Sequence, residues 1–177
     1  SAGKTRSGVA TLDVLAAAGA KEVVLDVDDL DVISVTCPKG KPLPFAIGPR
    51  DKELGSALTV QLEGNKQILI RYKTRPGASA LQWLAPELTA GKRKPYLFSQ
   101  GQPINNRSWI PTQDSPGIRQ TWSATLTVPA GLVAVMSGDR LDGEKGQAAP
   151  DGRRRVRFRM DKPVPPYLVA MAVGDLA

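Results

Sequence analysis

Apolar and polar residues alternate along much of this chain, and this alternation limits what the chain can fold into. In Leu58-Thr59-Val60-Gln61-Leu62 every second residue is apolar, and a second run, Ile68 to Lys73, follows after Glu63-Gly64-Asn65. A period of two places alternate side chains on opposite faces of a β-strand. A glycine-containing turn between two such runs is typical of a β-hairpin. We therefore expect two antiparallel strands that pair with each other.

Strand-like runs continue along the chain, and no capped helix of ordinary length interrupts them. The alternation over residues 9–14 favours a strand there, despite the alanines that follow. The pattern predicts an all-β fold with several sheets and long ordered loops, and 177 residues fit a single domain, 1–177. The further strand-like runs are residues 9–14, 21–27, 30–36, 122–128, 132–136 and 167–173.

Two long connections separate these runs. Residues 74–108 contain Trp83, Tyr96 and Phe98, so we expect this connection to be packed. Residues 137–153 hold no such anchors, and we expect an extended, mobile hairpin tip there. Between the two lies the stretch "PYLFSQGQPINNRSWIPTQDSP", Pro95 to Pro116, which is too polar and too rich in proline for a regular strand or helix.

Histidine is absent, and this absence removes whole classes of chemistry. The sequence has no His and one cysteine, Cys37. Catalytic triads with histidine, His-ligated metals, thiolate zinc sites and internal disulfides are therefore excluded from this chain. No stretch approaches the roughly 18 apolar residues of a membrane span.

The chain is basic, with a formal net charge of +7 and a pI of about 9.8. The charge concentrates in "RRRVRFRMDK", Arg153 to Lys162, where Val156 and Phe158 alternate with arginines. This strand would have one apolar and one basic face. Two interpretations follow: a basic strand that faces solvent or another domain, or the ligand face of a stand-alone β-sandwich module for an anionic partner. Nucleic acid is the less favoured ligand, because Phe158 lies on the face opposite the arginines.

The segment "SALQWLAPELTAGKRKPYLFSQGQPINNR", Ser79 to Arg107, resembles the amino-terminal domain of the zinc aminopeptidases. The resemblance is to the leukotriene A4 hydrolase and aminopeptidase B branch of the aminopeptidase N family, in the gluzincin clan. The segments "VVLDVDDLDVISV", "VPAGLVAVMSG" and "PVPPYLVAMAVGDL" resemble their counterparts in the same order, so the resemblance covers nearly the whole chain.

The resemblance implies a saddle-shaped, all-β domain that packs on a thermolysin-like catalytic domain. That catalytic domain carries a G-x-M-E-N motif and a zinc-binding H-E-x-x-H, neither of which occurs here. We therefore expect a non-catalytic piece of a zinc metallo-aminopeptidase that acts on peptides, with its own catalytic domain as partner and zinc only in the full-length enzyme. The compartment stays open: cytoplasm, or periplasm if a signal peptide preceded Ser1.

The resemblance also assigns a site to the turn formed by Gln100, Gly101 and Gln102. In the family this Gln-x-Gln turn projects into the active-site cleft and lines the pocket for the substrate's free amino end. A glutamine carbonyl can accept a hydrogen bond from an ammonium group without adding charge. Family members often have Cys where Gly101 stands, and the Pro103–Asn106 segment also departs from the vertebrate pattern, so epoxide hydrolysis does not follow.

Arg107 and Asp114 also match family positions. They are the only two charged residues between Lys94 and Pro116, and their charges are opposite. We expect them to form a structural ion pair that braces the loop, and we expect Trp83 and Trp109 to serve in packing.

Overall fold

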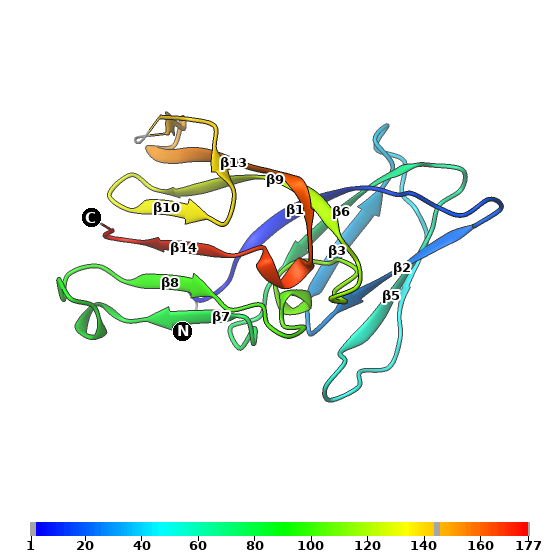
Figure 1. Ribbon diagram of the computed structural model, residues 1–177, viewed down its shortest axis with the longest axis horizontal. Coiled ribbons are helices and arrows are strands. Elements are labelled where there is room, and N and C mark those ends of the chain that lie inside the picture. The colour runs from blue at the N-terminus through cyan, green and yellow to red at the C-terminus, as the bar shows by residue number, and fades with distance from the viewer. Residues whose placement is uncertain (1–2, 144–145, 177) are drawn as a thin grey trace. The chain divides into compact units, whose positions relative to one another are not determined.

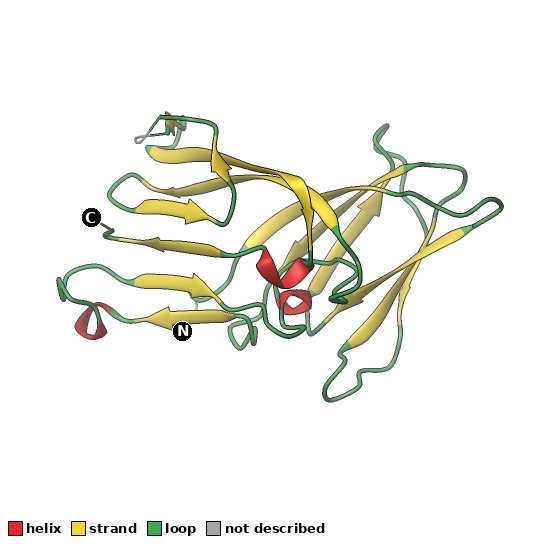
Figure 2. Ribbon diagram, viewed as in Figure 1, coloured by secondary structure: helices red, strands yellow, loops and turns green. Residues whose placement is uncertain are grey.

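The computed structural model describes residues 3–143 and 146–176, and its regular secondary structure consists almost entirely of antiparallel strands (Figures 1 and 2). The helical segments in these ranges are three single 3₁₀ turns, η1 Pro86–Leu88, η2 Asn106–Ser108 and η3 Pro166–Leu168. The all-β prediction is confirmed. The strands are β1 Ser7–Asp13, β2 Glu22–Val27, β3 Asp31–Thr36, β4 Phe45–Ile47, β5 Ser56–Gln61, β6 Gln67–Lys73, β7 Leu81–Leu84, β8 Tyr96–Ser99, β9 Gln120–Pro129, β10 Val133–Met136, β11 Asp139–Arg140, β12 Gln147–Ala148, β13 Arg153–Val164 and β14 Met171–Gly174.

The chain divides into two compact units. Unit 1 comprises Ser1–Ser79 and Ile104–Asp114, and unit 2 comprises Ala80–Pro103 and Ser115–Ala177. The polar stretch that stood out in the sequence is therefore shared between them. Its first part, with the glutamine turn, belongs to unit 2, and the part with Arg107 belongs to unit 1.

Unit 1 contains two three-stranded sheets, in the orders β1-β6-β3 and β2-β5-β4. Alternate side chains of β1, β2, β3, β5 and β6 point into one apolar core, as the alternation predicts, whereas all three residues of β4 are exposed. The fully buried members, such as Leu58, Val60, Ile68 and Ile70, come from both sheets. The core also contains Leu25, Val27, Leu30, Val35, Cys37, Leu43 and Leu62.

The expected hairpin between β5 and β6 is wrong, although the turn is present. Glu63 and Gly64 both take positive φ angles, 47° and 80°, as a tight turn requires. However, β5 pairs with β2 and β4, whereas β6 pairs with β1 and β3. The turn therefore leads from one sheet to the other. The consecutive strands β2 and β3 also lie in different sheets. In this arrangement β2, β3, β5 and β6 each bury one face in the shared core.

Unit 2 contains a long ribbon of β9 and β13, flanked by β11 and β12, and a four-stranded sheet in the order β10-β14-β8-β7 (Figure 1). The register of the ribbon pairs Val156 with Leu126 and Phe158 with Ala124. Arg155 and Arg157 face Thr127 and Thr125 on the alternate positions. The predicted division of this strand into an apolar and a basic face is confirmed.

Residues 74–108, which we expected to form a long packed connection, contain β7 and β8, and these two strands pair with each other. Each of these strands is only four residues long, which is too short for a period of two to identify it. Residues 137–153 contain β11 and β12, which pair with β13. Part of the expected mobile tip, residues 144–145, lies outside the described residues.

Core packing in unit 1 supplies a first prediction. Leu58 is 0% exposed, and its truncation in the Leu58→Ala variant should lower the free energy of unfolding by about 2–5 kcal/mol, since a cavity remains. The control is Val9→Ala, at a side chain that is 57% exposed, which should cost less than about 1 kcal/mol. Urea unfolding measures both, and equal losses would contradict the core assignment.

Candidate substrate-facing turn and buried ion pair

The glutamine turn begins where β8 ends. The backbone N–H of Gln100 donates to the carbonyl oxygen of Ala80 at 2.8 Å, so the pairing with the β7 side of the hairpin extends one residue beyond Ser99. Gln100 and Gln102 are exposed, whereas Gly101 between them is buried. The chain then continues through a cis peptide bond between Gln102 and Pro103. The turn thus presents two glutamines from the end of a regular strand.

The chemistry that such a turn can perform is binding. Each glutamine amide carries an acceptor oxygen and an NH₂ donor without a net charge. Within residues 3–143 and 146–176, no three His, Cys, Asp or Glu side chains gather in a group that could hold a metal ion. The same residues include no helix with the length and apolar character needed to cross a membrane.

Arg107 and Asp114 lie together in unit 1, and both are buried. The guanidinium Nε of Arg107 is 3.4 Å from Oδ2 of Asp114, and the same oxygen accepts the backbone N–H of Arg107 at 2.9 Å. Arg107 Nη2 donates to the carbonyl oxygen of Asp114 at 2.8 Å, and Nη1 donates to that of Leu54. Each polar atom in this list finds a partner within the protein, which is what burial of charged groups requires.

Asp26 is a third charged member of this cluster, and sequence reasoning missed it. Its Oδ1 lies 3.7 Å from Nη1 of Arg107, and its Oδ2 accepts the backbone N–H of Asp114 at 2.8 Å. Backbone bonds run beside these contacts, from Asp26 N–H to Thr112 and from Asp28 N–H to Arg107. The only signal in the sequence was the alternation of β2, which places Asp26 on the polar face. Asp26, Asp28, Asp29 and Asp31 lie close together between two apolar runs, and by itself this pattern indicates a solvated turn.

Trp109 packs inside the same segment. It is buried, and its indole Nε1 donates to the Oδ1 of Asn106 at 2.7 Å. A buried indole N–H normally needs such a partner. The expectation that Trp109 serves in packing is consistent with this burial.

Burial is the largest influence on the titration of Asp114. Removal of the carboxylate from water raises its pKa, whereas the hydrogen bonds and the charge of Arg107 lower it, and the net result is a raised pKa. Ionisation of Asp114 is therefore less favourable in the folded protein than in the unfolded chain. We interpret the pair as a device that fixes the position of residues 107–114 more than as a source of net stability.

The basic face of β13 is largely neutralised by carboxylates. Arg153 pairs with Asp151 at 2.6 Å, Arg157 with Asp142 at 2.9 Å, and Arg159 with Asp161 at 2.9 Å. The hydrogen bonds from Arg157 hold the pKa of Asp142 below its ordinary value. Carboxylates that already occupy three of the arginines compete with any anionic ligand, which weakens the reading of this face as a polyanion site.

Comparison with known proteins decides the family. Residues 2–168 match the Peptidase M1 N-terminal domain. The chain belongs to this family.

Curated relatives of this M1 N-terminal domain are much longer than the chain. Leukotriene A-4 hydrolase of Xenopus laevis is 41% identical over 160 residues, which cover 87% of this chain and 26% of the relative. Aminopeptidase B of Mus musculus is 36% identical over 189 residues, which cover 97% of this chain and 28% of the relative. The chain thus spans about a quarter of the length of the curated relatives that it matches.

Solved structures show the same fold. Yeast LTA4 hydrolase in complex with bestatin matches with a TM-score of 0.84 at 32% identity, over 98% of this chain and 26% of that chain. The M1 zinc metallopeptidase from Deinococcus radiodurans matches with a TM-score of 0.73 at 24% identity, over 95% of this chain and 37% of that chain. The resemblance inferred from the Ser79–Arg107 segment is confirmed.

The raised pKa of Asp114 predicts a pH dependence of stability. The unfolded pKa of an aspartate is about 3.9. Between that value and the higher folded pKa, the native state binds more protons than the unfolded chain, so the free energy of unfolding falls as pH rises. The Asp114→Asn variant cannot titrate and should lack this fall. Urea unfolding of both proteins across this window tests it; a wild-type stability that rises relative to the variant would show a lowered pKa instead.

Truncation should cost more than neutralisation. The Asp114→Ala variant leaves the backbone N–H and the guanidinium of Arg107 buried without their carboxylate, and we expect a loss of about 3–5 kcal/mol in the free energy of unfolding. Asp114→Asn keeps an acceptor oxygen and should lose clearly less. The control is Asp161→Ala, which removes the exposed partner of Arg159 and should change stability little. Chemical unfolding at neutral pH compares the three; equal effects of the two alanine variants would contradict a buried cluster.

Proposed function

We propose that this chain is the non-catalytic N-terminal domain of a zinc-dependent aminopeptidase that removes N-terminal amino acids from peptides. The support is membership of the Peptidase M1 N-terminal domain family together with relatives that are aminopeptidases. In the complete enzyme, zinc held by the catalytic domain would activate water toward the first peptide bond. The part of this chain would be recognition rather than bond cleavage.

Within that function, we propose that Gln100, Gly101 and Gln102 line the pocket for the free amino end of the substrate. The observation that carries this proposal is the exposure of both glutamines at the end of β8, with Gly101 buried between them. Amide oxygens can accept hydrogen bonds from the substrate ammonium group, and amide NH₂ groups can bind the substrate backbone. The anchored Gln100 backbone gives the turn a defined position.

The test is steady-state kinetics of the Gln102→Ala variant in the complete enzyme. Loss of one hydrogen bond to a charged group is worth about 1.5–3 kcal/mol, which corresponds to a fall of roughly 10–150-fold in kcat/KM. The fall should be large for peptides with a free amino end and small for any substrate cleaved without one. Gln102→Glu retains an acceptor and should recover much of the activity.

Two controls separate recognition from structure. The matched variant is Gln147→Ala, which removes an exposed glutamine of β12 and should leave kcat/KM unchanged. Thermal melting of Gln102→Ala should stay close to wild type, because the side chain is exposed. Wild-type kcat/KM in Gln102→Ala would refute the site, and a collapsed melting temperature would make the glutamine structural.

A further inference from the structure

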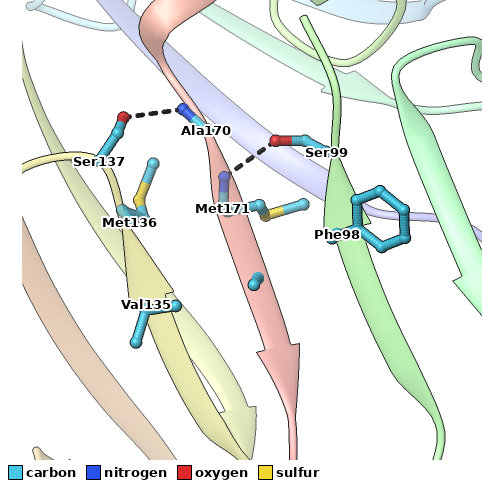
Figure 3. Close-up of a pocket in the computed structure, with 8 residues that line it drawn as sticks. Phe98, Ser99, Val135, Met136, Ser137, Ala170 and Met171 are labelled. Atoms are coloured by element: carbon cyan, nitrogen blue, oxygen red, sulfur yellow. Dashed lines mark hydrogen bonds between the residues drawn. The ribbon is translucent and has the colours of Figure 1, made fainter. Parts of the chain in front are cut away.

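Two serine hydroxyl groups bind the backbone where β14 begins. The Oγ of Ser99 accepts the backbone N–H of Met171, and the Oγ of Ser137 accepts that of Ala170, both at 2.9 Å (Figure 3). Ser99 is the last residue of β8, and Ser137 directly follows β10. Because β8 and β10 are the two neighbours of β14 in the sheet, the serines hold consecutive residues from opposite sides.

The strand register shows what the Ser99 hydroxyl replaces. The pairing of β8 with β14 ends at the pair of Phe98 and Ala172, and one further step along both strands would place Ser99 opposite Met171. In an antiparallel ladder the backbone carbonyl oxygen of Ser99 would accept the Met171 N–H at such a position. The side chain supplies the acceptor instead. The backbone of β8 can therefore leave β14 at this residue while the Met171 N–H keeps a partner.

The glutamine turn begins at the same point. Gln100 follows Ser99 directly, and its backbone N–H donates to the carbonyl oxygen of Ala80 at 2.8 Å. Two consecutive residues are thus tied in opposite directions, Ser99 to β14 and Gln100 to the residue that precedes β7. These two bonds fix the backbone that enters the turn, and the directions of the exposed Gln100 and Gln102 side chains depend on that backbone.

We propose that Ser99 is a positioning residue for the substrate pocket, and this inference rests on the function proposed for the glutamine turn. Its hydroxyl ends the backbone ladder between β8 and β14, and this sets where the turn starts. Without the hydroxyl, the Met171 N–H would take the carbonyl oxygen of residue 99, and the backbone of the turn would shift toward β14. A displacement of about 1 Å in a group that holds the substrate can lower the rate by about 10²-fold.

Steady-state kinetics of the Ser99→Ala variant in the complete enzyme tests this role. We expect kcat/KM for peptides with a free amino end to fall about tenfold, because the glutamines lose their alignment. Ser99→Thr retains the hydroxyl and should recover most of the activity. The matched control is Ser137→Ala, which removes the equivalent bond to Ala170 on the other side of β14 and a bond to the Leu168 carbonyl oxygen, and it should leave kcat/KM unchanged.

A combined variant separates positioning from a general loss of structure. Ser99 acts through the glutamines, so Ser99→Ala should lower kcat/KM by less than about twofold in the Gln100→Ala/Gln102→Ala background. A merely structural role would give the same fall in both backgrounds. The melting temperature of Ser99→Ala should fall no further than that of Ser137→Ala, because each variant removes a serine that bonds the backbone at the start of β14.

Wild-type kcat/KM in Ser99→Ala would overturn the inference, and so would equal falls in Ser99→Ala and Ser137→Ala or an undiminished fall in the background without the glutamines. If Ser99→Ala does not fold, Ser99→Cys replaces it, since its thiol is similar in size but a weak acceptor. The kinetics of Gln102→Ala show which proposal has failed. A fall in Gln102→Ala beside wild-type Ser99→Ala contradicts only the positioning role, whereas wild-type activity in Gln102→Ala refutes the pocket and this inference with it.

Discussion

The buried guanidinium of Arg107 is the group on which the local structure around residues 104–114 depends. A polar, proline-rich segment cannot form a sheet, so its backbone and its charges need other partners in the interior. Arg107 supplies them by bonding Asp114 and the Leu54 carbonyl, while Asp26 holds Asp114 from β2. The cluster places a segment far along the chain within unit 1, and its ionic character specifies one arrangement among the many that an apolar contact would allow.

Charge is distributed unevenly over unit 2, and this distribution agrees with its proposed role. The β9–β13 ribbon turns arginines and hydroxyl groups outward, and nearby carboxylates offset the charges of Arg153, Arg157 and Arg159. The neighbouring sheet has no charge and ends in two exposed glutamines. Neutral hydrogen-bonding groups at the end of an uncharged strand suit the substrate-binding part that we propose for the turn, whereas the charged ribbon suits contact with water.

Strand positions followed from the sequence where the alternation was long, and strand partners did not. The runs around Leu58 and Ile70 are strands because one face of each must be buried. Their pairing was mispredicted because a turn such as Glu63-Gly64 is compatible both with a hairpin and with a step between sheets. The choice depends on packing with β1 and β2, which lie far away in the sequence. The short runs of β7 and β8 gave no period to read.

The sequence by itself determined the family, through the long Ser79–Arg107 motif, and it excluded a histidine-ligated metal from this chain. It also determined the two faces of β13, because side-chain direction in a strand follows from residue order alone. Tertiary structure decided the rest. Asp26 joins Arg107 and Asp114 only because β2 passes beside them, and β5 and β6 lie in different sheets only because they pair with different strands. Both facts depend on long-range contacts, which a local pattern does not encode.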